Sequence, residues 1–227
     1  MLIRYCLLAL FGVVTYGCTA VTDEVRETVE YAFKTQQDAE LSSEEIEKFP
    51  YTSLYAQWEE KPRTLIVLGF IDKPNDRHFI TAEKETLVIR NGRIIRTQNL
   101  NGDLLAASNL EQDPLQCIVN QPNDCKSRWQ RNYDYQMQER TFSRTVVSQF
   151  SVVEEQTLEM PFGKVNATLV QEKGRFELSG ETFTNRFWIE SDGHVVKSEQ
   201  QLFPGETSLT LTQVTWIGRD YSNKAAK

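Results

Sequence analysis

The chain has 227 residues, with 25 basic and 32 acidic side chains and a formal net charge of −7 at pH 7. An acidic surface repels nucleic acid and anionic lipid headgroups, which excludes both as expected partners, and an anionic polysaccharide would need a local basic patch. The two histidines, His78 and His194, lie far apart in the sequence, so a metal site would be short of nitrogen ligands. We therefore expect neither a metal nor another cofactor.

The chain begins with the layout of a secretory signal peptide. Arg4 precedes an apolar run over residues 5–14, and Gly17 and Cys18 follow shortly after it. The run is shorter than the roughly 20 residues that a membrane-spanning helix needs. Gly17-Cys18 resembles the lipobox of bacterial lipoproteins, which implies that Cys18 is acylated and becomes the new amino terminus. Ordinary secretion with cleavage nearby is the alternative.

Removal of residues 1–17 leaves 210 residues and moves the formal charge from −7 to −8, because the segment carries Arg4. We predict a lipidated tether over residues 18–21, a single β-rich domain over residues 22–220 and a polar tail over residues 221–227. No later stretch is long and apolar enough to span a bilayer, so membrane attachment would come from the lipid on Cys18.

The four cysteines divide into two groups under this interpretation. Cys6 leaves with the signal peptide and Cys18 is acylated, so Cys117 and Cys125 remain. Two cysteines in an oxidising compartment favour a disulfide, and the residues between them include turn formers that let the chain double back. The spacing does not fit a CxxC metal or redox motif. We predict a structural Cys117–Cys125 disulfide.

Two short helices are expected before the strands. Thr22 is placed to cap the first, whose apolar positions share one face over residues 25–33. Ser42 and Glu45 form the capping box of the second, and Pro50 ends it. We expect both helices to pack on a sheet.

From residue 51 onward the pattern indicates strands and turns. Asn91-Gly92 is the strongest short hairpin signal, and it joins strands expected over residues 86–90 and 93–97. The other expected strands cover residues 65–71, 129–137, 142–152, 165–170, 183–189, 195–202 and 208–216. Around ten short strands with hairpin turns, without βαβ alternation, predict a mainly β fold: an antiparallel β-barrel-like or sandwich domain.

Six short motifs follow one another along the mature chain. They cover residues 41–56, 67–70, 91–96, 113–115, 185–189 and 195–200. This ordered series, which extends from about Val21 to Trp216, resembles the YjbF/GfcB lipoprotein family of group 4 capsule and exopolysaccharide secretion. The resemblance implies a β-barrel-like fold and a lipid-anchored outer-membrane protein that faces the periplasm. It supplies no catalytic residues, and Thr19 after the cysteine agrees with outer-membrane sorting.

Two aromatic clusters are the best candidates for a binding surface. Aromatic faces stack on sugar rings, and neighbouring arginines can hydrogen-bond to hydroxyl groups. The clusters supply Trp129, Arg131, Arg186 and Trp188 as candidate contacts to glycan or to a partner protein. The alternative is that strand alternation directs the rings into the core.

Three classes of function follow from these observations. The first is a non-enzymatic accessory in polysaccharide export or assembly, which binds the glycan or an outer-membrane polysaccharide-export protein. The second is a glycan-modifying enzyme with two paired carboxylates, for which the candidates are Asp72, Glu83, Glu85, Glu177, Glu181 and Glu190. The third is a lipid or lipoprotein carrier with a large apolar cavity. We expect His78 and His194 to be solvated turn residues, and no nucleophile motif occurs. The accessory function is the main prediction.

Overall fold

The computed structural model describes residues 38–59, 61–118 and 124–218. Within these residues, twelve strands form one antiparallel sheet, with one α-helix and two 3-10 helices beside it. The predicted first helix, Cys18 and the predicted tail lie outside the described residues. The helices are α2 (Ser43–Lys48), η1 (Leu110–Gln112) and η2 (Pro114–Gln116). The strands are β1 (Ser53–Trp58), β2 (Thr64–Asp72), β3 (Asp76–Ile80), β4 (Thr86–Arg90), β5 (Arg93–Gln98), β6 (Gly102–Ala107), β7 (Arg128–Met137), β8 (Arg140–Met160), β9 (Gly163–Phe176), β10 (Thr182–Ile189), β11 (Val195–Gln200) and β12 (Leu209–Thr215).

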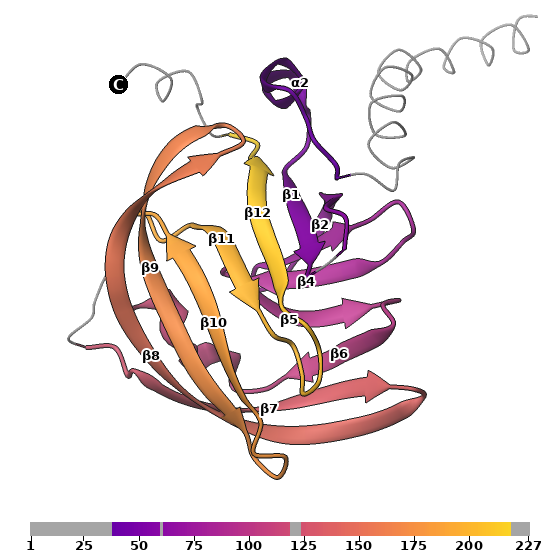
Figure 1. Ribbon diagram of the computed structural model, residues 1–227, viewed down its shortest axis with the longest axis vertical. Coiled ribbons are helices and arrows are strands. Elements are labelled where there is room, and N and C mark those ends of the chain that lie inside the picture. The colour runs from indigo at the N-terminus through magenta and orange to yellow at the C-terminus, as the bar shows by residue number, and fades with distance from the viewer. Residues whose placement is uncertain (1–37, 60, 119–123, 219–227) are drawn as a thin grey trace, which may run out of the picture.

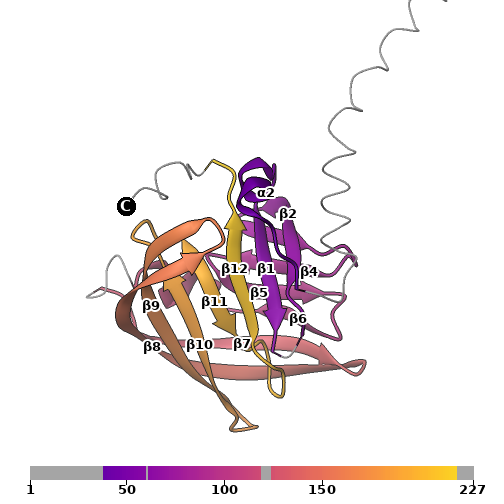
Figure 2. The ribbon, with the colours of Figure 1, turned by 45° about the horizontal axis from the view of Figure 1, so that its top comes forward.

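The sheet is a nearly closed barrel (Figures 1 and 2). Strands pair with their neighbours in sequence, and β12 returns to pair with β1. The barrel has a seam between β5 and β6, which lie side by side but are not paired as neighbouring strands of the sheet. Side chains link them instead. Thr97 Oγ1 donates to Asp103 Oδ1 at 2.8 Å, and the Leu104 N–H donates to Thr97 Oγ1 at 2.9 Å. Near-closure leaves little unpaired sheet edge for a partner strand to join. The barrel ends and the outer face are therefore the surfaces on which we look for a binding site.

Strand alternation fills the interior. Along β7, Trp129, Arg131, Tyr133 and Tyr135 are buried at every second position, while the residues between them are more exposed. One apolar cluster surrounds Tyr133 and Tyr135, and a second surrounds Trp129 together with residues of the β6–β7 connection. The Arg131 guanidinium lies over the rings of both Trp129 and Tyr133, so a charged layer meets both apolar clusters.

The outer face is covered on one side by α2 and by the long β8–β9 hairpin. Ile46 of α2 packs with Tyr55 of β1 and Val214 of β12. Phe162, at the tip of the β8–β9 hairpin, packs against this group and also against the cluster that contains Trp188. In Figure 1 the hairpin tip curves across toward β12. Two outer apolar clusters therefore fasten these elements to the barrel wall.

Locally encoded features agree with the sequence. The α2 capping box forms, since Ser42 N donates to Glu45 Oε2 at 2.8 Å and Glu45 N donates to Ser42 Oγ at 3.3 Å. Asn91 and Gly92 both adopt positive φ, at 50° and 84°, as the hairpin signal predicts. The mainly antiparallel β prediction is confirmed, in its barrel-like form. No described helix is long and apolar enough to cross a membrane.

The sequence underestimates β9, which continues to Phe176 rather than ending near residue 170. The added part carries Glu172, which is fully buried at an inward position. A charged residue there breaks the apolar alternation by which strands are recognised, even though it faces the interior. The extension is therefore hidden in the sequence because of the charge cluster described below.

Candidate functional site

A pocket of about 310 Å³ opens at the end of the barrel toward which β12 points in Figure 1. We call this the mouth pocket. Its walls come from β3, the β4–β5 turn, the β10–β11 turn and the end of β12. These elements supply Arg77, Asn91, Asp192, His194 and Trp216, with inner apolar residues at the base. Four segments distant in sequence thus meet at one barrel end.

An aromatic and cationic group dominates the pocket wall. The Arg77 guanidinium carbon lies 4.8 Å from the centre of the Trp216 ring, a cation–π geometry. His194 meets Trp216 edge-on, with the ring planes 71° apart. His194 Nε2 lies 3.2 Å from Gln213 Oε1, and the His194 N–H donates to Asp192 Oδ1 at 2.9 Å. The side chains are therefore held in place by one another.

Arg77 carries a positive charge that the described part of the chain does not neutralise. No described carboxylate oxygen lies within 4.0 Å of its guanidinium nitrogens, and burial lowers its pKa from the ordinary value without a compensating carboxylate. An arginine remains protonated in proteins despite such a shift. The mouth pocket thus presents a half-buried cation with spare hydrogen-bond donors.

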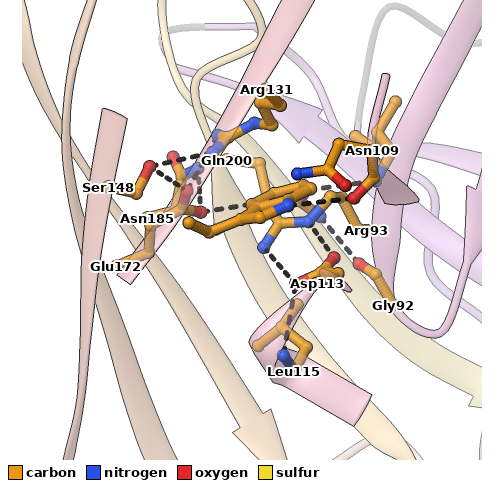
Figure 3. Close-up of polar contacts among 12 residues, drawn as sticks. Gly92, Arg93, Asn109, Asp113, Leu115, Arg131, Ser148, Glu172, Asn185 and Gln200 are labelled. Atoms are coloured by element: carbon orange, nitrogen blue, oxygen red, sulfur yellow. Dashed lines mark hydrogen bonds and ion pairs between the residues drawn. The ribbon is translucent and has the colours of Figure 1, made fainter. Parts of the chain in front are cut away.

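A buried charge cluster lies deeper in the barrel (Figure 3). We define it as Arg93, Asp113, Arg131 and Glu172. Arg93 Nη1 lies 2.9 Å from Glu172 Oε2, and Arg131 Nη2 lies 2.8 Å from Glu172 Oε1. Asp113, the N-cap of η2, accepts from Arg93 Nε at 2.5 Å. Two cations and two anions share the interior, so their formal charges cancel.

Polar neighbours complete the coordination of Glu172. Ser148 Oγ donates to Oε1 at 2.7 Å, and Asn185 Nδ2 donates to Oε2 at 3.0 Å. Burial raises the pKa of Glu172, but the Arg131 and Arg93 charges outweigh this effect and, with the hydrogen bonds, hold the pKa at about 2. Glu172 is therefore ionised at neutral pH, and both of its carboxylate oxygens are paired with neighbouring donors. This makes it a structural anion rather than a general acid.

Gln200 connects the charge cluster to the mouth pocket. Its Nε2 donates to the Gly92 carbonyl at 2.9 Å, and its Oε1 accepts from Ile94 N at 3.1 Å. These bonds fix the backbone on both sides of Arg93, the residue that enters the cluster. Asn91 and Gly92, one step earlier, line the pocket. The cluster and the pocket therefore share one rigid turn.

The predicted contact residues occupy two different places. Trp129 and Arg131 are 2% exposed and point into the barrel, where Arg131 belongs to the charge cluster. Trp188 is 6% exposed on the outer face, and its Nε1 donates to Gln156 Oε1 at 2.8 Å. Arg186 is exposed and pairs with Glu199 at 2.9 Å. The structure does not gather these four into one surface, and their contact role stays a prediction.

The histidine prediction needs correction for one residue. His78 is 4% exposed rather than solvated, because its ring stacks on Phe70 and its Nε2 lies 3.1 Å from Asp72 Oδ2. His194 does lie at the β10–β11 turn, half-buried in the pocket wall. Sequence reasoning missed Arg77 and the site role of Trp216, since only folding brings them together. Their positions beside strand ends were the available signal.

The predicted disulfide is confirmed. Cys117 and Cys125 are bonded, with their Cα atoms 5.6 Å apart. Cys117 is the C-cap of η2, and Cys125 packs against the apolar cluster around Trp129. The disulfide therefore fastens the segment that carries Asp113 into the charge cluster.

The donor set of the described residues does not form a metal site, since no group of three or more His, Cys, Asp or Glu side chains is placed to hold an ion there. Of the residues that line the mouth pocket, Asp192 supplies the one carboxylate. The arrangement offers an aromatic surface, a cation, amides and a hydroxyl. Such groups bind a polyhydroxylated or anionic ligand by stacking and hydrogen bonding.

The fold and pocket define a single-chain antiparallel barrel with a polar site at one end. Comparisons with known proteins identify the family. The family described as "Group 4 capsule polysaccharide lipoprotein gfcB, YjbF" matches residues 26–214, so the chain belongs to the YjbF family. This confirms the resemblance drawn from the ordered motifs.

Two curated relatives come from Escherichia coli (strain K12). The chain is 28% identical to the "Uncharacterized lipoprotein GfcB" over 210 residues, which cover 92% of this chain and 97% of that protein. It is 25% identical to the "Uncharacterized lipoprotein YjbF" over 206 residues, which cover 89% and 95%. The crystal structure of the hypothetical lipoprotein YmcC from Escherichia coli (K12) matches with a TM-score of 0.73 and 26% identity, covering 87% of this chain and 98% of that one. The relatives are lipoproteins of a capsule-associated family.

Proposed function

We propose that this protein is an outer-membrane lipoprotein, facing the periplasm, that assists the export or assembly of capsule or exopolysaccharide by binding rather than by catalysis. The mouth pocket carries the proposal, because it combines Trp216, the uncompensated cation of Arg77 and hydrogen-bonding groups in a preformed hollow. Its volume of about 310 Å³ lies at the small end of ligand pockets. A short stretch of glycan is the ligand that fits both the family and these groups.

The pocket chemistry favours contact over glycan hydrolysis. Glycosidases need two carboxyl groups that face each other across the scissile bond. Asp192 is the carboxylate of the mouth pocket, and it already accepts a hydrogen bond from the His194 backbone. Glu172 is enclosed by two arginines and has a pKa of about 2, so it cannot deliver a proton near neutral pH.

The barrel interior also favours a glycan accessory over a lipid carrier. Two apolar side-chain clusters and the charge cluster occupy the inside, with Phe176, Phe203 and Leu104 fully buried among them. An acyl chain would need a large apolar cavity. The mouth pocket has polar groups in its wall instead, which suit hydroxyl groups and charges.

Lipidation at Cys18 would place this pocket where export occurs. An anchor confines the domain near a polysaccharide-export protein and the emerging glycan, and this raises their effective concentration. Weak contacts at the mouth pocket can then suffice. The expected consequence is that a correctly folded but unanchored protein supports less polysaccharide secretion.

The test complements a strain that lacks the gene and measures surface polysaccharide. We expect the wild type and Asp192→Asn to restore it, because asparagine keeps an acceptor for the His194 N–H. Arg77→Gln, and Cys18→Ala behind a cleavable secretion signal, should each restore severalfold less at equal protein level. If Asp192→Asn abolishes the polysaccharide while the unanchored protein restores it, an enzyme is the better account.

A further inference from the structure

A second hollow lies on the outer face of the barrel, away from the mouth pocket. It has a volume of about 680 Å³ and crosses β7, β8, β9 and β10, which lie side by side in Figure 1. We call it the outer groove and define it by six side chains on its surface. They are Arg128, Gln149, Lys173, Arg175, Thr182 and Thr184. None of them belongs to the charge cluster or to the mouth pocket.

Strand register places these side chains in two neighbouring rows. Arg128 pairs with Gln149, Gln149 with Lys173, and Lys173 with Thr184, so four strands contribute one continuous row. Arg175 and Thr182 pair in the next row, two residues further along their strands. Directly opposed residues share a face, and adjacent strands lie about 4.8 Å apart, so the row extends about 14 Å. The groove is therefore elongated across the sheet.

The charge of the outer groove is opposite to that of the whole protein. Arg128, Lys173 and Arg175 are all exposed, in a chain whose formal charge is −7. Arg175 is neutralised by Glu177, at 2.8 Å. For Arg128 and Lys173, no carboxylate among the described residues comes within 4.0 Å of the side-chain nitrogens. Two uncompensated cations, two strands apart, make a local basic patch that the net charge conceals.

Neutral groups between these cations can recognise hydroxyls. The Gln149 side-chain amide lies between Arg128 and Lys173 in the row, and Thr184 extends it. An amide offers two donors and an acceptor, and a threonine hydroxyl offers one donor and two acceptor sites. Alternating cations and hydroxyl-binding groups along an extended line match a polymer that carries regularly spaced carboxylates and many hydroxyls.

We propose that the outer groove binds a segment of an acidic polysaccharide, with Arg128 and Lys173 contacting its negative groups. The anionic character of the ligand follows from the groove itself, while its being a polysaccharide rests on the proposed function. An anionic membrane is broad enough to meet the acidic remainder of the surface as well, which repels it, whereas a single polymer strand need contact only the groove. Arg186 lies two residues beyond Thr184 on the same outer face, so this predicted contact residue borders the groove.

The test uses the secreted, unanchored chain (Cys18→Ala behind a cleavable secretion signal) with its groove intact as the wild type, because a lipid anchor would insert into any vesicle. It measures binding to polygalacturonate, a linear acidic polysaccharide. Dextran serves as the neutral probe. Vesicles with about 30% phosphatidylglycerol, which have a negative surface, serve as the membrane probe. The groove variant is Arg128→Gln with Lys173→Gln. The matched control is Arg140→Gln with Lys84→Gln, which removes the same charge from exposed positions elsewhere.

We expect the wild type and control to bind polygalacturonate, with affinity falling as salt rises, and the groove variant to bind about tenfold more weakly. Dextran and vesicles should bind poorly to all three. Equal affinity of groove variant and control, preferential binding of vesicles, or no binding of polygalacturonate by the wild type would each overturn the inference.

The proposed function is judged separately, because the complementation test acts through Arg77 and Cys18. If polygalacturonate binding depends on the groove while Arg77→Gln still restores full secretion, the groove inference stands and the function proposed for the mouth pocket is wrong.

Discussion

Two of the arginine–tryptophan pairs in the described barrel differ in how the charge of the arginine is balanced. Arg131 lies 4.1 Å from the Trp129 ring in the interior, and Arg77 lies 4.8 Å from the Trp216 ring at the barrel end. Arg131 is paired with Glu172, whereas no described carboxylate within 4.0 Å balances Arg77. A fully buried cation requires an internal anion, since its desolvation is otherwise too costly. A half-buried cation can remain open to a ligand, so we assign Arg131 a structural role and propose a binding role for Arg77.

The largest expected effect on stability comes from removal of the internal anion. Glu172→Gln keeps the shape of the side chain but leaves Arg93 and Arg131 with too little negative charge. We expect the free energy of unfolding to fall by roughly 3–5 kcal/mol, because an uncompensated charge stays buried. Urea denaturation measures this change. Glu199→Gln, which removes the partly exposed partner of the exposed Arg186, is the control and should cost about 0.2–1 kcal/mol. Similar losses in the two variants would contradict the assignment.

Acid should act on the same anion. Burial alone would raise the pKa of Glu172, but Arg131 and Arg93 hold it at about 2, below the ordinary value of 4.5. The folded state therefore binds this proton less readily than the unfolded state. The stability due to ionised Glu172 is fully present above pH 4.5 and is lost as the pH falls toward 2. Between these values, stability should decline less steeply in Glu172→Gln than in the wild type. Parallel pH profiles would argue against a paired, ionised Glu172.

Removal of the disulfide should destabilise the charge cluster less than Glu172→Gln does. Replacing both Cys117 and Cys125 with serine frees the segment that ends η2 and carries Asp113, the second partner of Arg93. We expect a loss of about 2–3 kcal/mol in the free energy of unfolding, the range for a short disulfide-closed loop. Denaturation of the oxidised wild type and the variant gives the difference. Alkylation of unreduced protein is the check on the wild type, and two alkylated cysteines would remove the basis of the prediction.

Local signals in the sequence predicted the parts of the fold that are decided locally. Asn91-Gly92 forms its hairpin turn and Ser42 with Glu45 forms its capping box, because each needs only nearby backbone. Ordered motifs predicted the family, and the cysteine count predicted the disulfide.

The interior charges were beyond local reasoning. Arg93 and Glu172 are 79 residues apart in sequence, and Glu172 lies beyond residue 170, where the expected strand ended. The sequence pattern therefore showed neither that Glu172 faces inward nor that it meets Arg93. The same limit hid the mouth pocket, since Arg77 and Trp216 come from β3 and the end of β12. Polar residues at inward strand positions, such as Arg131 and Asn185, were the signal that an internal network exists.

The smallest expected effect on stability belongs to the pocket. Arg77→Gln removes a cation that balances no described carboxylate, so the free energy of unfolding should change by less than about 1 kcal/mol. Urea denaturation beside Arg140→Gln, an exposed control, measures this. A loss as large as that of Glu172→Gln would show that Arg77 is structural, and the comparison between the two arginines would fail.

The most direct test of the account measures glycan binding and stability in the same Arg77→Gln protein. Oligosaccharides from the native surface polysaccharide are titrated by calorimetry into the full-length chain in detergent. We predict that Arg77→Gln binds about tenfold more weakly than wild type and Arg140→Gln, as expected for loss of a charge-assisted contact, while its unfolding midpoint is nearly unchanged. Wild-type affinity in Arg77→Gln, or weaker binding that only accompanies unfolding, would contradict the claim that the mouth pocket holds an open cation for a ligand.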